Sequence, residues 1–229
     1  EKEKRIFFCS RFNLMGFSLK HKDSKSEARV GLLATKSGEI ETPVFMPVCT
    51  KGVPKALTTN NLKDLGFDMV VANAYHLFLK PGHEQIKNYG GLHSFMGWDR
   101  NILSDSGGFQ VYSLSSSAKI SDDGVSFKSF LDGSVNFISP ELSIEIQEYL
   151  GSDIMMIFDD CPKPDSDYSR ILESINRTRE WANRSKKARK SDSKLFGIVQ
   201  GGIYEDLRKT SLDHMLDIEF DGYAIGGLG

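Results

Sequence analysis

The chain has 229 residues, of which 39% are apolar, enough for one hydrophobic core and too many for a disordered protein. Its 29 basic and 31 acidic residues nearly cancel, so the net charge of -2 indicates neither a nucleic acid nor a membrane as partner. The three cysteines form no close pair, which argues against a disulfide framework and against a zinc site within the chain. No stretch is long and apolar enough for a signal peptide or a membrane span, so a cytoplasmic protein is expected.

Three segments stand outside the main pattern of the chain. Position 1 is Glu rather than Met and regular patterning begins only after Met15, so residues 1–19 are predicted to be a disordered or misread extension. Residues 29–44 are interpreted as a β-hairpin that turns at Ser37–Gly38. A second hairpin is predicted over residues 124–137, where alternating apolar residues flank Asp132–Gly133.

Short apolar runs alternate with helix-length intervals along the rest of the chain. They begin at Pro43, Asp68, Asn101, Asp153, Leu195 and Tyr223. Near-continuous apolarity is typical of strands that are buried on both faces of a parallel sheet. A helix is predicted over residues 140–150, with Ser139 as N-cap and Gly151 as stop, and an amphipathic helix over 168–190. The alternation of strands and helices indicates the α/β class.

Polar residues and glycines gather directly after these runs, at the end that parallel strands share. In a parallel βα barrel the active site is built at this end. We therefore predict an irregular TIM (β/α)8 barrel that is incomplete, with about six of the eight strands and with hairpin insertions. Residues 20–229 are expected to be the N-terminal and central part of this single barrel domain. A doubly wound open sheet produces the same alternation and remains the alternative.

The stretch SDSGGF at residues 104–109 follows the third run and combines an acid with small residues. The carboxylate of Asp105 could accept hydrogen bonds or move a proton. The bare backbone at Gly107 and Gly108 lets a flat ligand approach the amides. A local Asx turn at Asp105 is the simpler interpretation, and Phe109 could belong to the core or stack on an aromatic ring.

Other strand ends carry further candidates. Asp159 and Asp160 follow a buried strand, where unpaired carboxylates are costly, although they could also cap the following turn. Gln200 precedes a glycine pair, and a second pair ends at Gly227. Taken together these groups would suit a planar heterocycle such as guanine. Asp159 could accept from the ring N–H and the exocyclic amine, while Gln200 and a glycine N–H donate to the carbonyl oxygen.

Several longer stretches carry a resemblance to a known family. They are ANAYHLFLKPG (72–82), GGLHSFMGWDR (90–100), SDSGGFQVYSL (104–114), FDDC (158–161), FGIVQGG (196–202) and FDGYAIGGL (220–228). From about Lys20 to its last residue the chain resembles the tRNA-guanine transglycosylases, the bacterial type most closely. The resemblance implies a TIM-barrel pentosyltransferase of queuosine biosynthesis. Such an enzyme exchanges the wobble guanine of tRNA for a 7-deazaguanine, 7-aminomethyl-7-deazaguanine in bacteria, through a covalent ribosyl-enzyme intermediate.

The resemblance also implies roles for single residues. Asp105 would be the acid and base near the reacting base, and the Leu228 backbone would meet the 7-substituent. Cys161 matches a position associated with the small bacterial precursor. The other implied pocket residues are Asn73, Ser106, Gly107, Gly108, Phe109, Asp159, Gln200 and Gly227. A tRNA with a wobble guanine, a 7-deazaguanine base and a second copy of the chain are the expected partners.

Two departures from the family bear on these expectations. The nucleophilic aspartate of the family and its structural zinc site, made of three cysteines and a histidine, lie beyond residue 229. No nucleophile, metal ligand or cofactor is therefore assigned within this chain. Asp160 stands where bacterial members usually have Glu, and Gly229 stands where Ala or Ser is usual.

Two alternatives for the function remain open. A non-catalytic accessory subunit lacks the base-site acids, so Asp105 and Asp159 disfavour it. An inactive fragment that cannot close its barrel is the second alternative, and we expect open strand edges to make such a chain aggregate. The basic run 177–194 could touch tRNA phosphates, but it is more typical of a solvated helix face, with Trp181 as a packing residue.

Overall fold

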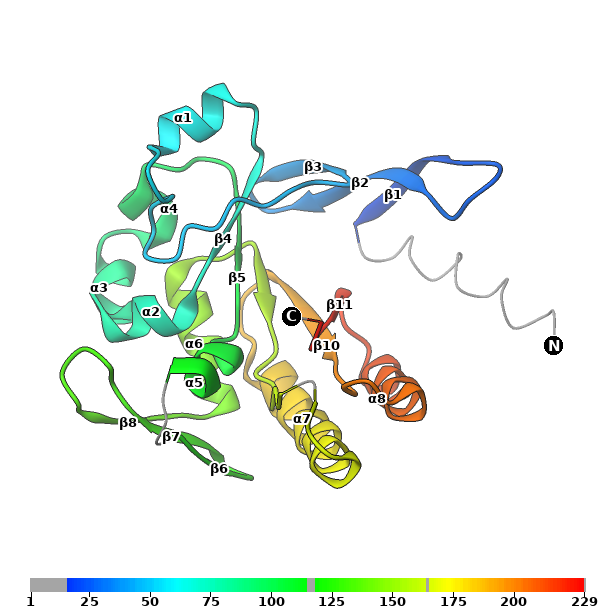
Figure 1. Ribbon diagram of the computed structural model, residues 1–229. Coiled ribbons are helices and arrows are strands. Elements are labelled where there is room, and N and C mark those ends of the chain that lie inside the picture. Colours follow the sequence, from blue (N-terminus) through cyan, green and yellow to red (C-terminus); the bar gives the residue numbers. More distant parts are fainter. Residues whose placement is uncertain (1–15, 115–117, 164, 229) are drawn as a thin grey trace.

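A parallel sheet lies at the centre of the computed structural model, which describes residues 16–114, 118–163 and 165–228 (Figure 1). The strands are β4 (Met69–Ala72), β5 (Asn101–Ser104), β9 (Ile154–Met156), β10 (Lys194–Val199) and β11 (Gly222–Ile225). They pair in the order β11-β10-β9-β5-β4, and every pair is parallel. The α/β class with a parallel sheet is confirmed.

The order of the strands bears on the two architectures considered from the sequence. Neighbours in the sheet follow chain order without a reversal. A doubly wound sheet reverses its order at a switch point, whereas a barrel does not. The strand order therefore favours the barrel over the open sheet. Closure into eight strands stays a prediction.

One of the six apolar runs does not become a strand. The run that begins at Pro43 contributes a single parallel bridge, from Val48 to Val71. Two hydrogen bonds fix it, from Cys49 N to Val71 O at 2.7 Å and from Val71 N to Pro47 O at 2.9 Å. Prolines at 43 and 47 lack the N–H that a longer ladder needs. The six strands expected for the parallel sheet are thus corrected to five strands and one bridge among the described residues.

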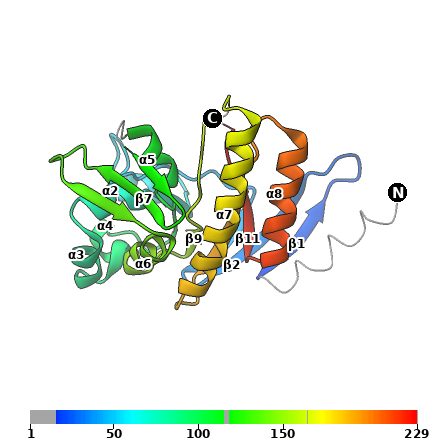
Figure 2. The ribbon, with the colours of Figure 1, turned by 90° about the horizontal axis from the view of Figure 1, so that it is seen from below.

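Helices pack against the strands through apolar clusters. They are α1 (Thr59–Asp64), α2 (Ala74–Leu79), α3 (His83–Asn88), α4 (Gly91–Met96), α5 (Gly108–Leu114), α6 (Pro140–Leu150), α7 (Tyr168–Ala188) and α8 (Glu205–Ile218). Helices α7 and α8 lie side by side (Figure 2). Ala182 of α7 and Met215 of α8 share a buried cluster with Leu195 of β10. Another cluster joins Ile146 of α6 to Ile102 of β5. This packing fixes the positions of β5 and β10 and of the segments that follow these strands.

Both predicted hairpins are present. The first belongs to an antiparallel sheet of β1 (Phe17–Lys22), β2 (Arg29–Thr35) and β3 (Gly38–Thr42). Pairing of Thr35 with Gly38 places the turn at Lys36–Ser37, one residue earlier than predicted. The second belongs to the sheet of β6 (Lys119–Ser121), β7 (Gly124–Lys128) and β8 (Val135–Ile138). Gly133 has φ +75°, which explains the glycine in its turn.

The predicted N-terminal extension overlaps the first strand. Strand β1 begins at Phe17, so residues 17–19 of the predicted extension belong to the fold. Its partner is β2, which it meets in antiparallel register from Phe17 with Leu33 to Lys22 with Arg29. Residues 1–15, including Cys9, lie outside the described residues.

The two helices predicted from local signals are confirmed. Helix α6 spans Pro140–Leu150, the side chain of Ser139 accepts a hydrogen bond from Leu142 N, and Gly151 ends the helix at φ 73°. Helix α7 buries Ile171, Ile175, Thr178 and Ala182 on one face, as the periodicity indicated. Trp181 is fully buried on the same helix, stacks on Phe158 at 4.9 Å and donates to Asp122 O. Trp181 is thus a packing residue.

Candidate functional site

The ends of four neighbouring strands meet at one place. Parallel pairing puts the carboxyl ends of β5, β9, β10 and β11 along the same edge. Ser106, which follows β5, donates from Oγ to Asp159 Oδ1 after β9 at 3.2 Å. Gln200, which follows β10, donates from Nε2 to Asp159 Oδ2 at 2.7 Å. A Cβ added to Gly226 after β11 would lie 2.6 Å from Gln200 Nε2. The predicted site residues after these strands are therefore in contact.

Asp105 is held by uncharged donors from two sides. Its Oδ1 accepts from Ala74 N at 2.8 Å, at the start of α2, and its Oδ2 accepts from Gln110 Nε2 at 2.9 Å. The amide of Asn73 also donates to Oδ2, and Gly107 N–H is a further donor. The carboxylate thus does more than form a local Asx turn. Burial raises the pKa of Asp105 to about 6, against these hydrogen bonds, which lower it.

Asp159 is the second carboxylate of the site. Its side chain is bound by Ser106 and Gln200, which come from other strand ends, so it does not simply cap its own turn. The residue is 5% exposed. Burial raises the pKa of Asp159 to about 6, and the negative charge of Asp160 acts in the same direction. Two acids on adjacent strand ends thus have pKa values near neutrality, as is common in active sites.

Glycines allow the strand ends to approach each other closely. A Cβ on Gly108 would lie 2.7 Å from both the backbone and the carboxylate oxygen of Asp159. Gly107 has φ +84° and would meet Tyr75. Gly227 has φ +67°, and a Cβ there would lie 3.0 Å from Gln200 Oε1. Larger residues at these positions would separate the β5, β9 and β11 ends.

The remaining predicted residues belong to the segments that follow β5, β9 and β11. Phe109 at the start of α5 is 58% exposed, so it is not a core residue. Leu228 is 75% exposed and follows Gly227. Cys161 is partly buried, and burial together with nearby Asp159 raises the pKa of its thiol to about 12. The thiol is therefore neutral and is not an activated nucleophile.

Sequence reasoning missed three residues that position the site. Gln110 is one turn into α5 and donates to Asp105. Ser143 of α6 donates to the carbonyl of Ser106 at 2.8 Å. Arg208 of α8 donates to Gly202 O at 2.8 Å and to Gly226 O at 3.0 Å, so it ties the β10 and β11 ends together. Of these, only Gln110 lies inside one of the stretches that carry the family resemblance, SDSGGFQVYSL at residues 104–114.

A groove of about 1090 Å³ adjoins the site on its β11 side. Gly227 and Leu228 line it, together with apolar residues of α8 such as Leu212 and Leu216. Strand β11 pairs only with β10 in the described sheet, so its other edge faces this groove. The groove thus extends from the strand-end contact along β11 and α8.

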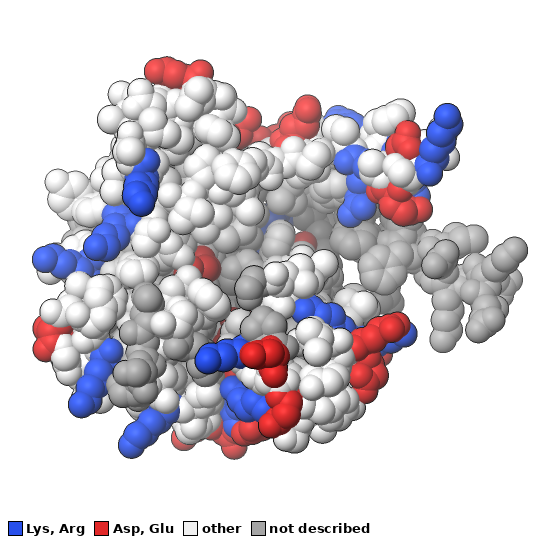
Figure 3. Space-filling model, viewed as in Figure 1, with Lys and Arg blue, Asp and Glu red and all other residues white. Residues whose placement is uncertain are grey.

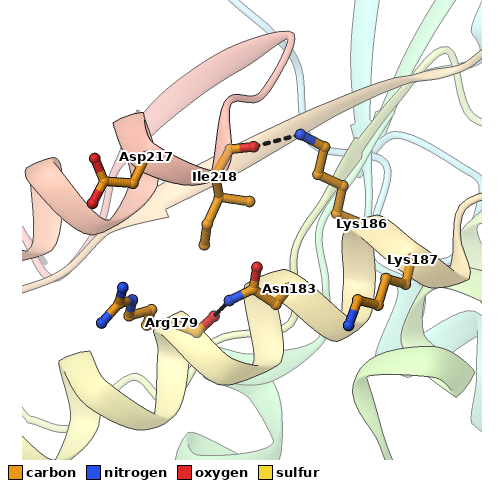
Figure 4. A pocket seen from close by; sticks show the side chains of 6 residues that line it. All are labelled: Arg179, Asn183, Lys186, Lys187, Asp217 and Ile218. Atoms are coloured by element: carbon orange, nitrogen blue, oxygen red, sulfur yellow. Dashed lines mark hydrogen bonds between the residues drawn. The ribbon is translucent and has the colours of Figure 1, made fainter.

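The basic run 177–194 is mostly engaged within the chain. Arg184 binds Glu141 at 2.7 Å, and Arg189 binds Asp221 at 2.5 Å. Figure 4 shows a separate pocket of about 330 Å³ between α7 and α8, where Lys186 donates to the carbonyl of Ile218. On the face shown in Figure 3, basic and acidic side chains are interspersed. Several basic side chains of the run thus bind groups of the chain itself.

In the described part of the chain, no group of three or more His, Cys, Asp and Glu side chains is arranged to hold a metal ion. None of the helices described is both long enough and apolar enough to cross a bilayer.

Comparison with known proteins identifies the family. The sequence model described as queuine tRNA-ribosyltransferase matches residues 23–229. The chain belongs to this family. Proteins named queuine tRNA-ribosyltransferase from Thermoanaerobacter sp. (strain X514) and Thermotoga neapolitana are 54% identical over 214 residues and 55% identical over 208 residues. These matches cover 93% and 90% of this chain but 57% and 56% of the two relatives. The chain thus spans little more than half the length of these relatives.

Proposed function

We propose that the strand-end site binds a guanine-type base and that the chain acts in tRNA-guanine transglycosylation. In this reaction the wobble guanine of tRNA is exchanged for a 7-deazaguanine, 7-aminomethyl-7-deazaguanine in the proposed bacterial form. The observation that carries the proposal is the juxtaposition of Ser106, Asp159 and Gln200 beside Asp105. Membership of the family supports it.

The base is recognised through its hydrogen-bonding edge. An ionised Asp159 accepts from the ring N1–H and from the exocyclic amine of guanine. The Gln200 amide and the Gly227 N–H donate to the carbonyl oxygen. Gln200 already donates to Asp159, so the two side chains are oriented before the base arrives. Phe109 is exposed, follows Gly108 in the chain and offers its ring for stacking.

Asp105 transfers the proton in both halves of the exchange. A pKa of about 6 lets the carboxyl group be protonated or ionised near neutral pH. In the first half a carboxylate attacks C1′ of the ribose, the glycosidic C–N bond breaks, and guanine leaves with the proton of Asp105. In the second half Asp105 takes the N9 proton of the incoming base as that base attacks C1′ and releases the carboxylate. Two inversions give net retention.

The attacking carboxylate is not assigned to any residue from 1 to 229. What we assign to this chain is the reading of the base and the proton transfer. The tRNA contributes its wobble nucleotide, which has to leave the stacked loop to reach the strand ends. A homodimer and a location in the cytoplasm complete the proposal.

Exchange of radiolabelled guanine into a tRNA with a wobble guanine tests the proposed function. We expect the intact gene product, the parent protein of these tests, to transfer label into this tRNA and not into one with a wobble adenine. Asp105→Asn should lower the rate by about 10²- to 10⁴-fold, the usual contribution of a general acid and base. A parent protein that leaves the tRNA unlabelled would contradict the proposal.

Asp221→Asn serves as the matched control, because Asp221 lies before β11, at the other end of the sheet, where it binds Arg189. This variant should keep the exchange rate per folded molecule. Guanine binding without exchange in the parent would favour the non-catalytic alternative instead.

A further inference from the structure

One face of helix α7 surrounds Asp160, the residue next to the proposed base-reading Asp159. Arg170 Nη2 donates to Asp160 Oδ1 and Arg177 Nη1 donates to Oδ2, both at 2.6 Å. Ser174 Oγ donates to the carbonyl of Asp160 at 3.1 Å, and Asp160 N–H donates to Thr178 Oγ1 at 3.1 Å. Positions 170, 174, 177 and 178 share one helical face. The helix thus binds both backbone groups and both carboxylate oxygens of a single residue.

The charge balance around Asp160 is unusual for a buried acid. Its side chain is fully buried, and two guanidinium groups contact it. Arg177 also binds Glu173 at 2.5 Å and Asp122 at 3.3 Å, so its charge is shared with two exposed acids. Arg170 approaches with two nitrogens, at 2.9 Å and 2.6 Å. Removing one partner from such a buried arrangement is usually strongly destabilising.

Asp159 has few other charged neighbours. The groups that bind it from the β5 and β10 ends are Ser106 and Gln200, which are uncharged. On its own strand end the ionisable neighbours are Asp160, whose charge raises the pKa of Asp159, and the neutral thiol of Cys161. Among the charged groups, Asp160 raises the pKa of Asp159, and Arg170 and Arg177 contact the Asp160 carboxylate. Asp105, on the neighbouring β5 end, is the other acid at this edge of the sheet.

We propose that Asp160 is a positioning residue and that Arg170 and Arg177 offset the repulsion that its charge exerts on the ionised Asp159. Because α7 binds both the backbone and the carboxylate of Asp160, the orientation of this residue is fixed, and the adjacent Asp159 side chain is directed toward the ends of β5 and β10. The arginines then permit Asp159 to be ionised when it accepts hydrogen bonds from a guanine-type base. This inference rests on the proposed function for its ligand, but the charge coupling itself is independent of it.

The proposal makes predictions of opposite sign. Arg177→Gln leaves the Asp160 charge less compensated, so the ionised Asp159 is disfavoured and its titration midpoint should move to higher pH. Asp160→Asn removes the like charge and leaves both arginines, so the midpoint should move to lower pH. If Asp160 acted only through packing, both variants would loosen the segment around Asp159 and would not shift its titration midpoint in opposite directions. Each shift should be about half a pH unit or more, given the effect of a single nearby charge.

The titration is followed directly by the ¹³C chemical shift of the Asp159 carboxyl group in protein with labelled aspartate, with Asp159→Asn as the assignment control. Guanine affinity is measured across the same pH range by calorimetry. Arg184→Gln is the matched charge control, because Arg184 lies on the same helix but binds Glu141 instead of Asp160. Arg170→Gln is a second test of the arginine pair and should move the midpoint in the same direction as Arg177→Gln. If one of the two variants does not fold, the other still tests the proposal.

The shifts of four variant midpoints from the midpoint of the parent decide the outcome. Upward shifts in the arginine variants, a downward shift in Asp160→Asn and an unchanged midpoint in Arg184→Gln would support the proposal. Equal midpoints in all variants, or shifts of the same sign in Arg177→Gln and Asp160→Asn, would overturn it. A parent that titrates as described but binds no guanine would refute the proposed function and leave the charge coupling established.

Discussion

Buried acids lie at both ends of the parallel sheet, and their surroundings differ. At the amino end, burial pushes the pKa of Asp153 upward, but hydrogen bonds from His93, Ser37 and Ile102 N–H outweigh it and leave the pKa lowered. These contacts include Ser37 Oγ at 2.6 Å and Ile102 N at 2.7 Å. At the carboxyl end, burial outweighs the donors of Asp105 and Asp159, whose pKa values both rise to about 6.

The difference fits the proposed function, in which the carboxyl end of the sheet carries the chemistry and the amino end contributes to stability. Asp153 connects the hairpin turn at Ser37 to the starts of β5 and β9, so folding stabilises its ionised form. Asp105 and Asp159 at the other end accept hydrogen bonds from uncharged donors. With a pKa of about 6, each can be protonated or ionised near neutral pH. A barrel uses its two faces in this way, with the active site at the carboxyl ends of the strands.

The largest effect is expected for base binding. Asp159→Asn replaces an ionised acceptor by an amide that presents a donor to the guanine edge, so two charge-assisted hydrogen bonds are lost. Guanine affinity should fall by about 1000-fold, or about 4 kcal/mol. Calorimetry above pH 7 measures it. Asp153→Asn, the same change at the amino end, should keep the affinity of the molecules that remain folded; a comparable loss there would erase the contrast between the ends.

Stability should respond in the opposite pattern. Asp153→Asn weakens the acceptor for Ser37 Oγ and Ile102 N–H in a place closed to water, so the free energy of unfolding should fall by about 3 kcal/mol at pH 7. Urea unfolding followed by circular dichroism provides the value. Asp159→Asn should not lower stability at this pH, because it removes a carboxylate whose ionised form is disfavoured in the folded state. A larger loss in Asp159→Asn than in Asp153→Asn would contradict the comparison.

Much of the fold was predictable because its signals are local. Ser139, Pro140 and Gly151 fix the ends of α6, and the prediction is correct at both ends. The run at Pro43 was overcounted as a strand, since its single bridge to Val71 depends on how the segment meets β4. Apolar composition alone does not distinguish a strand from a segment that pairs once.

The candidate site divides in a similar way. Parallel strands share their carboxyl ends, so the meeting of Ser106, Asp159 and Gln200 followed from the order of the pattern. The donors of Asp105 on α2 and the arginines around Asp160 depend on how each helix is rotated against the sheet, which the strand pattern does not fix. One signal was available, because the polar Ser174 and Thr178 fall in the apolar stripe of α7 and are buried.

The free energy of unfolding of the parent should also decrease as the pH rises, and Asp159 should account for part of this decrease. Its folded pKa of about 6 exceeds the ordinary value of 3.8, so the folded state retains the proton longer than the unfolded state. The contribution of this group is present below pH 3.8 and is lost as pH rises through about 6. Between pH 4 and 7 the parent should lose stability relative to Asp159→Asn on the order of 2 kcal/mol. Urea titrations at several pH values measure this, and parallel curves for the two proteins would contradict it.

The smallest expected effect concerns Ser106, which donates to Asp159 at 3.2 Å. Ser106→Ala removes one neutral donor while Gln200 keeps its hydrogen bond at 2.7 Å, so guanine affinity should fall about fivefold, or about 1 kcal/mol. The loss of a donor to the ionised form should also raise the pH midpoint of binding slightly. Ser143→Ala is the matched control, because Ser143 donates to the backbone carbonyl of Ser106 and not to the acid. An equal midpoint shift in both variants would mean that Ser106 acts by holding the loop, and the carboxyl end would then resemble the amino end more closely than its pKa values indicate.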